Sequence, residues 1–169
     1  VVVEPGTRTG LPVLTDNPRE VGADRICNAV GVADRFGGPA VVVDFGTATT
    51  FDVISPAGQY VGGAIAPGLE ISLEALSRRG AQLRQVELLR PRSVVAKNTV
   101  EALQSGMVFG FTSLVEGLVA RVVTELGRGQ SPDAGSSVME LALGRILTLG
   151  ADLGVRVGGG GIEDDLHAV

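Results

Sequence analysis

The sequence has few of the side chains on which nucleophilic and metal-dependent catalysis most often rely. A single cysteine, Cys27, excludes an internal disulfide and a zinc site built from cysteines, and we expect it to be a small packed residue on a helix. The only histidine, His167, lies close to the C-terminal end, where chains are usually poorly ordered. A Ser-His-Asp or Cys-His mechanism is therefore not expected. If the protein is an enzyme, we expect a carboxylate to perform its acid–base chemistry.

Aromatic residues and positive charge are also scarce. Aromatics make up 4% of the chain and tryptophan is absent, so the core is expected to consist of Val, Leu, Ile and Ala. The formal net charge of −5 argues against binding to a nucleic-acid backbone, which requires a basic surface. No run of about 18 or more apolar residues is present, so we expect no membrane-spanning helix. The sequence has neither the pattern of a signal peptide nor a disulfide framework, which favours the cytoplasm.

The overall composition is that of a globular protein with one main domain. The chain has 169 residues, of which 44% are hydrophobic and 20% are charged. Regular patterns extend over residues 1–127. Residues 128–169 differ in character: a Gly/Ser/Pro-rich linker precedes a candidate helix over 138–155 and a glycine-rich, acidic tail that we expect to be loose.

Three segments have the spacing of apolar residues that is typical of helices. The first covers residues 18–36, with a proline in its first turn and two glycines after its last residue. The second covers residues 67–80 and is bounded by a proline and a glycine. The third, residues 97–127, is either one long helix or a pair with a bend near 106–110. Its apolar stripe is wide, so a partner as well as the protein's own sheet could cover it.

Between the first two helices, three apolar and β-branched runs are typical of strands. They cover residues 40–45, 49–54 and 60–66, and a Ser-Pro-Ala-Gly turn separates the second from the third. The first run lacks the alternation of a half-exposed strand, which indicates burial on both faces. The sequence therefore predicts an α/β protein with a three-strand β-meander followed by helices.

A carboxylate ends the first predicted strand and opens into a turn with many hydroxyls, "DFGTATT". Asp44 is either a functional group held by the strand or a cap that accepts amides of its own turn. Gly46 and Thr47 offer backbone N–H groups, and glycine allows a phosphate to approach closely. The threonines, including Thr49 and Thr50, are equally explained as strand formers.

Two helix starts carry polar residues that could contact a substrate. Asp24 and Arg25 follow Gly22, and a carboxylate in a first turn is most simply a cap favoured by the helix dipole. The alternative is a base that orients a hydroxyl, with the guanidinium gripping a polar substrate. At the later start, Asn98 is a candidate cap and Thr99 a weak candidate ligand.

Taken together and in this order, four stretches resemble the type III pantothenate kinase family. They are "TDNPREVGADR", "VVDFGTATTFDV", "GGAIAPGLEIS" and "KNTVEALQSG", and the resemblance extends over about residues 1–127. It implies the ribonuclease-H-like, actin-like kinase fold. It also implies transfer of the γ-phosphoryl group of ATP to the primary hydroxyl of pantothenate, giving 4'-phosphopantothenate in the first step towards coenzyme A.

The resemblance also implies roles for individual residues. Gly22, Ala23, Asp24 and Arg25 match the family's pantothenate-gripping motif, in which the aspartate is the proton acceptor. Thr99 matches a further substrate contact.

On the nucleotide side, Asp44 matches the carboxylate that holds a monovalent cation, K⁺ or NH₄⁺, and Thr47 matches a contact to an ATP phosphate. ATP is expected to carry Mg²⁺. Members of the family work as homodimers, with substrate bound near the interface.

Two family motifs are absent from this sequence. Neither the first phosphate loop, Asp-x-Gly-Asn-Thr, nor the late Ala-Thr-Gly-Gly motif occurs. We therefore expect the chain to be N-terminally truncated, to supply mainly the substrate side of the cleft and to have weak or no turnover alone. The alternatives are a non-catalytic accessory or regulatory protein of the same fold, and a kinase for another small alcohol.

Overall fold

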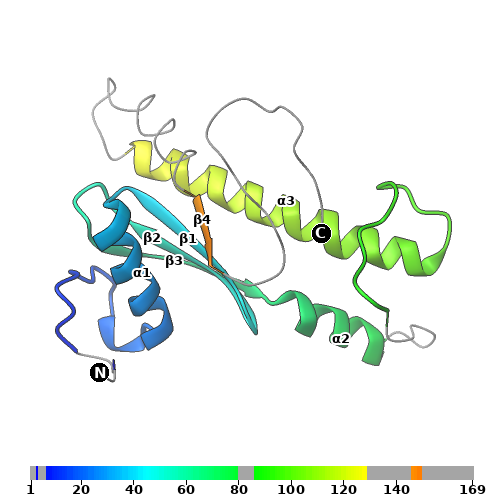
Figure 1. Ribbon diagram of the computed structural model, residues 1–169, viewed down its shortest axis with the longest axis horizontal. Helices are drawn as coiled ribbons and strands as arrows, with labels where there is room; N and C mark the ends of the chain where they lie inside the picture. Colours follow the sequence, from blue (N-terminus) through cyan, green and yellow to red (C-terminus); the bar gives the residue numbers. More distant parts are fainter. Residues whose placement is uncertain (1–2, 4–6, 80–85, 129–145, 150–169) are drawn as a thin grey trace.

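The computed structural model describes residues 3, 7–79, 86–128 and 146–149. Within these residues, a sheet lies between helix α1 (Ala23–Phe36) on one face and helix α3 (Thr99–Arg128) on the other (Figure 1). Helix α2 (Leu69–Arg79) continues from the third strand and lies beside the first part of α3. The mixed α/β architecture expected from the sequence is confirmed.

The first three strands form the predicted β-meander. Strands β1 (Ala40–Phe45), β2 (Ala48–Ile54) and β3 (Tyr60–Pro67) pair antiparallel in sequence order. Their bounds agree with the sequence prediction to within one residue. The predicted turn before β3 is closed by a hydrogen bond of 2.9 Å from the Gly58 amide to the Ser55 carbonyl, with Gly58 at a φ of 71°.

A fourth strand corrects the prediction of a helix over residues 138–155. Strand β4 (Ile146–Leu149) pairs parallel with β1, so that the strand order is β3-β2-β1-β4. A short apolar run is compatible with a helix or with a buried strand, and periodicity alone does not separate them. The edge of β1 that β2 leaves open accepts this segment as a strand. The rest of the predicted helix and the tail lie outside the described residues.

The first predicted helix is in fact two helices. A 3₁₀ turn, η1 (Pro18–Glu20), precedes α1, and the two are separated by Val21 and Gly22 in extended conformation. The reason is burial: Val21 is 7% exposed and packs in the core beneath α1, which a continuous helix would prevent. Helix α1 ends as predicted, since Gly37 adopts a φ of 71° and its amide bonds to the Ala33 carbonyl.

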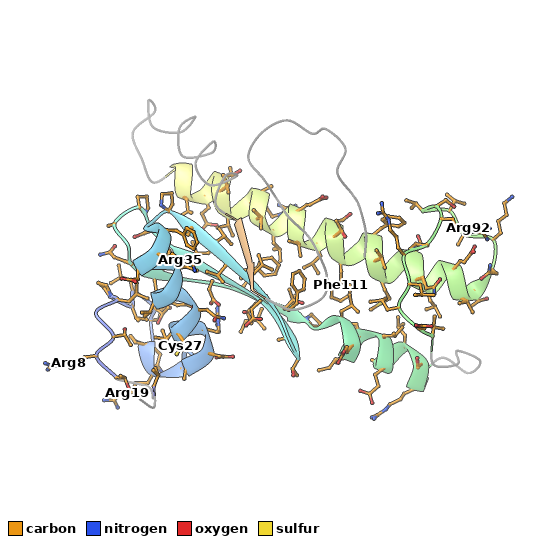
Figure 2. The ribbon with its side chains drawn as sticks, viewed as in Figure 1. Arg8, Arg19, Cys27, Arg35, Arg92 and Phe111 are labelled. Atoms are coloured by element: carbon orange, nitrogen blue, oxygen red, sulfur yellow. The ribbon has the colours of Figure 1, made fainter. Side chains whose placement is uncertain are left out.

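The prediction that Cys27 is packed is wrong, because its side chain is exposed on α1 (Figure 2). The helix turns about 100° per residue, so Cys27 lies roughly 200° around the axis from Arg25. Arg25, Asn28 and Ala29 face the sheet, and Cys27 faces away from it.

Helix α3 is one continuous helix of 30 residues, so the alternative of a helical pair is wrong. Its second half packs on the sheet through Val115, Val119 and Val123. By length and composition alone, Thr99–Gly127 could also cross a membrane, contrary to the expectation of no membrane-spanning helix.

Polar contacts hold the segment before α3 against the first turns of that helix. The Arg92 Nε donates to Glu101 over 3.1 Å, Gln104 donates to the Glu87 carbonyl over 2.9 Å and Ser105 donates to the Val94 carbonyl over 2.6 Å. Residues 86–98 form neither helix nor strand. Arg92, at this end of the molecule, is labelled in Figure 2.

Candidate active site

The sheet face under α1 is apolar at one end and polar at the other. Side chains alternate between the faces of a strand, so Val42 and Asp44 of β1 share the face under α1. In the strand register, Asp44 lies opposite Thr50 and Val42 lies opposite Asp52. Asp44, Thr50 and Asp52 therefore form a polar cluster towards the C-terminal end of β1. The apolar end of the same face belongs to the core under α1.

Helix α1 contributes two side chains to this polar cluster. Arg25 and Asn28 are three residues apart and so lie on one side of the helix. The Arg25 Nε donates to Asp52 Oδ1 over 2.6 Å, and Asn28 Nδ2 donates to Asp44 Oδ2 over 3.0 Å. The two contacts join the first turns of α1 to the end of β1 and to β2.

Asp52 is the centre of a buried hydrogen-bond network. Its side chain is 0% exposed, and besides Arg25 it accepts hydrogen bonds from the Tyr60 hydroxyl at 2.8 Å and from Thr50 at 3.4 Å. Burial raises the pKa of Asp52, although the Tyr60 hydroxyl and the Arg25 charge act in the opposite direction. Burial and the neighbouring Asp52 also raise the pKa of Tyr60.

A glycine on β3 provides the space for the Arg25 guanidinium. A Cβ atom built on Gly63 would lie 3.2 Å from Arg25 Nη2 and 1.7 Å from the Phe51 carbonyl oxygen. The Arg25 guanidinium also lies over the Tyr60 ring, with its carbon 5.9 Å from the ring centroid. Arg25 is therefore enclosed by two strands and by its own helix.

The predicted base, Asp24, lies on the surface in the first turn of α1. Its Oδ1 accepts the Arg25 backbone amide over 2.8 Å and so satisfies one amide of the first turn, while Gly22 occupies the N-cap position. A Cβ atom on Gly22 would lie 2.5 Å from this same Oδ1. Gly22 thus leaves room for the carboxylate, and Ala23, half-buried, begins the helix.

The interpretation of Asp44 as a cap of its own turn is wrong. The Gly46 amide bonds instead to the Ala48 carbonyl over 3.0 Å, and Asp44 is held by Asn28. Within the described residues, no hydrogen bond reaches Asp44 Oδ1. No group of three or more His, Cys, Asp or Glu side chains suited to a metal occurs there either.

The turn that contains Thr47 packs against the start of α2. The Gly68 amide donates to the Thr47 carbonyl over 3.1 Å. A Cβ atom on Gly68 would lie 2.3 Å from that carbonyl oxygen and 2.4 Å from the Gly46 carbonyl oxygen. The Thr47 side chain is exposed, so it is free of the core and faces solvent near a helix N-terminus.

Thr99 is the predicted site residue that the structure leaves apart from the others. It begins α3 at the end of the molecule opposite α1 (Figure 1), and its side chain is exposed. Asn98 caps this helix as predicted, accepting the Glu101 amide over 2.9 Å. Within one copy of the described chain, Thr99 therefore does not reach the cluster around Asp24 and Asp44.

Sequence reasoning missed Asn28, Asp52 and Tyr60. Asp52 carried a usable signal, because it is a charged residue between Phe51 and Val53 in a strand that is otherwise buried. Charged residues are rarely fully buried unless they are paired, so its position called for a cationic partner. Asn28 carried no comparable signal.

Comparison with known proteins gives consistent matches over this part of the chain. A family model described as type III pantothenate kinase matches residues 1–121. A type III pantothenate kinase of Nocardioides is 73% identical over 130 residues, which are 76% of this chain and 51% of that protein. One of Streptomyces griseus is 67% identical over 75% of this chain and 48% of that protein.

A solved structure from Campylobacter jejuni, described as a conserved putative Baf family transcriptional activator, also aligns. The TM-score is 0.40 and the sequence identity 28%, over 54% of this chain and 44% of that chain. The chain spans about half the length of the curated relatives it matches. The family model covers most of the chain, including every predicted site residue, and the chain belongs to the type III pantothenate kinase family.

Proposed function

We propose that these residues form the pantothenate-binding part of a kinase that transfers the γ-phosphoryl group of ATP to the primary hydroxyl of pantothenate, giving 4'-phosphopantothenate. One observation carries the proposal. Helix α1 sets the Gly22–Arg25 segment beside the strand end that bears Asp44, and the Asn28–Asp44 hydrogen bond ties the two together. The ribonuclease-H-like, actin-like kinase fold and a domain boundary near residue 127 belong to the same proposal.

On the substrate side, Asp24 orients the hydroxyl and accepts its proton. Its carboxylate is solvent-exposed in the first helical turn, where a substrate can reach it, and Gly22 keeps the space beside it open. Gly22 and Ala23 present backbone groups to the substrate, and Arg25 donates to its oxygens. Phosphoryl transfer needs mainly positioning and charge neutralisation, which suits a site with neither histidine nor cysteine in a catalytic role.

On the nucleotide side, Thr47 contacts a phosphate of ATP, which carries Mg²⁺. The backbone around Thr47 abuts the N-terminus of α2, and a helix N-terminus favours an anion. A monovalent cation, K⁺ or NH₄⁺, would supply positive charge against the phosphates. Asp44 holds it with the carboxylate oxygen that Asn28 leaves available.

The position of Thr99 is explained by a homodimer. Thr99 is remote from Asp24 within one copy, so a contact to the same substrate has to come from a second copy (Figure 1). Helix α3 also offers apolar surface to such a partner. Only 22% of its most apolar window is buried within the chain. The cytoplasm is the proposed location.

A coupled ADP-release assay with ATP, Mg²⁺, K⁺ and pantothenate tests the proposed activity, and calorimetry tests pantothenate binding. We expect the chain to bind pantothenate and to turn over weakly, because it spans about half the length of its relatives. Asp24→Asn should abolish the remaining turnover. Robust turnover that survives Asp24→Asn would remove Asp24 from the role of base.

The alternative functions predict different results in the same experiments. A kinase for another small alcohol would release ADP with that alcohol and not with pantothenate. A non-catalytic accessory protein would bind neither ATP nor pantothenate. Either result would contradict the proposal.

A further inference from the structure

Asp52 has no role in the function proposed above, and yet it is a fully buried carboxylate in the middle of a strand. Burying a carboxylate is costly unless it is paired and hydrogen-bonded. Asp52 has three such partners, and its Oδ1 accepts from both Arg25 Nε, at 2.6 Å, and the Tyr60 hydroxyl, at 2.8 Å. One oxygen atom thus connects the core tyrosine to the partly exposed Arg25.

Tyr60 is itself held firmly. Its side chain is 0% exposed, and its backbone is bonded on both sides. Its amide donates to the Pro12 carbonyl over 2.9 Å, and its carbonyl accepts the Leu14 amide over 2.8 Å. The Tyr60 hydroxyl therefore fixes the position of the Asp52 carboxylate from the core side.

The Arg25 guanidinium is held through its Nε, and its two Nη groups remain available. Its side chain is 16% exposed, and Nε makes the contact with Asp52. Within the described residues, no acceptor binds its Nη1 and Nη2 groups, which carry most of the N–H donors of a guanidinium. The planar guanidinium has a fixed fork of donors, so holding Nε also sets the direction of the Nη groups.

We propose that Asp52 and Tyr60 are positioning residues, which hold Arg25 by Nε so that its Nη groups are directed at the oxygens of pantothenate. The inference rests on the proposed function, since it assumes that Arg25 contacts this substrate. It adds residues from β2 and β3 to a site otherwise built from α1 and the end of β1. Gly63 belongs to the same arrangement, because a Cβ atom there would lie 3.2 Å from Arg25 Nη2.

Calorimetry of pantothenate binding is the first test. Asp52→Asn keeps the shape of the side chain and removes the charge, and we expect it to weaken pantothenate binding by at least about tenfold. Tyr60→Phe should weaken binding in the same direction and by less. Val123→Ala is the matched control, because it lowers stability from the opposite face of the sheet and should leave the dissociation constant unchanged.

A double-mutant cycle with Arg25→Met separates positioning from a general structural effect. If Asp52 acts through Arg25, Asp52→Asn should change the dissociation constant by less than about twofold in the Arg25→Met background. An equal loss in both backgrounds, or no loss in the single variant, would overturn the inference and leave the proposed function standing. Failure of the wild type to bind pantothenate would overturn the proposed function and the inference together.

NMR of the Arg25 Nε–H group provides a measurement that needs no substrate. In the wild type, this proton should exchange slowly with water because it is hydrogen-bonded to a buried carboxylate, and Arg25→Lys assigns its signal. We expect exchange to accelerate in Asp52→Asn and, to a smaller extent, in Tyr60→Phe. A signal that exchanges rapidly in the wild type would overturn the inference by itself.

Discussion

Gly22 illustrates how a residue without a side chain can determine the position of the carboxylate proposed as the base. It is the N-cap of α1, with a φ of −56° and a ψ of 146° that other residues also adopt. Its importance therefore does not come from backbone strain. Glycine is needed here for steric reasons, because a Cβ atom at this position would lie 2.5 Å from Asp24 Oδ1.

Gly22→Ala is expected to affect function more than stability. The Asp24 carboxylate can rotate away from the new methyl group, so the free energy of unfolding should change by no more than about 1 kcal/mol. Pantothenate binding and turnover should fall, because the carboxylate no longer occupies its position. Urea unfolding and calorimetry measure the two effects. Unchanged pantothenate affinity and turnover would contradict the role given to this glycine.

The buried Asp52 carboxyl makes stability depend on pH. Burial raises its pKa in the folded protein above the usual value of about 3.9, so the folded chain holds this proton more tightly than the unfolded chain. The resulting stability is fully present below the unfolded pKa and is lost as the pH rises through the raised, folded pKa. Asp52→Asn has no such proton, so the unfolding free energy of the wild type should fall relative to that of the variant as the pH rises from about 3 towards neutrality.

Urea unfolding of both proteins across this pH range measures the difference. Tyr60→Phe removes a hydrogen bond that lowers the Asp52 pKa, and it should therefore move the pH-dependent change to higher pH. A difference between wild type and Asp52→Asn that is the same at every pH would contradict the raised pKa.

At the scale of elements, the local pattern predicted strands β1 to β3 to within one residue because each has a strong β-branched or apolar run between turn residues. The same reasoning failed at residues 146–149, where four apolar or β-branched residues suit either a helix or a strand. The decision there came from the free edge of β1, which no local pattern reveals. The local pattern also failed to predict the break at Val21, whose burial separates η1 from α1.

Two glycines that look equivalent in the sequence should respond in opposite ways to replacement by alanine. Gly31 lies inside α1 with nothing within 4 Å of an added Cβ atom, so Gly31→Ala should raise the free energy of unfolding by up to about 1 kcal/mol. Gly63 lies in β3, where the added Cβ atom would be 1.7 Å from a backbone carbonyl of β2. Gly63→Ala should lower stability by about 1–3 kcal/mol or more.

Thermal or urea unfolding of these two variants checks the prediction, and each serves as the control for the other. Equal changes in the free energy of unfolding for the two variants would contradict the prediction. They would mean that a small movement of the strands relieves the close contact between β2 and β3 at Gly63.

At the scale of the whole molecule, exposed apolar residues gather at the end where α3 begins. Val94, Val95 and Val100 are 67%, 82% and 50% exposed, and Thr99 lies among them. This end of the chain carries the residue whose proposed substrate contact requires a second copy. It is therefore the part of the surface where we expect the homodimer to form.

Placing a charge in this surface should weaken the dimer. Val95→Glu and Val100→Glu would bury an unpaired carboxylate on association, and we expect each to raise the dimer dissociation constant by at least about tenfold. Ala120→Glu is the control, because it adds the same charge at an exposed position in the second half of α3. Sedimentation equilibrium measures the change. A wild type that is monomeric at all accessible concentrations would contradict the proposed homodimer.

The sequence by itself determined the order and type of most elements and the segments that carry the family resemblance. These depend on local periodicity, turn residues and glycine positions, all of which act over a few residues. Only the tertiary structure decided which side chains meet. Arg25 and Asp52 are 27 positions apart, and Asn28 and Asp44 are 16 apart. Their contacts depend on strand register and on where α1 crosses the sheet, and burial of the apolar face sets both.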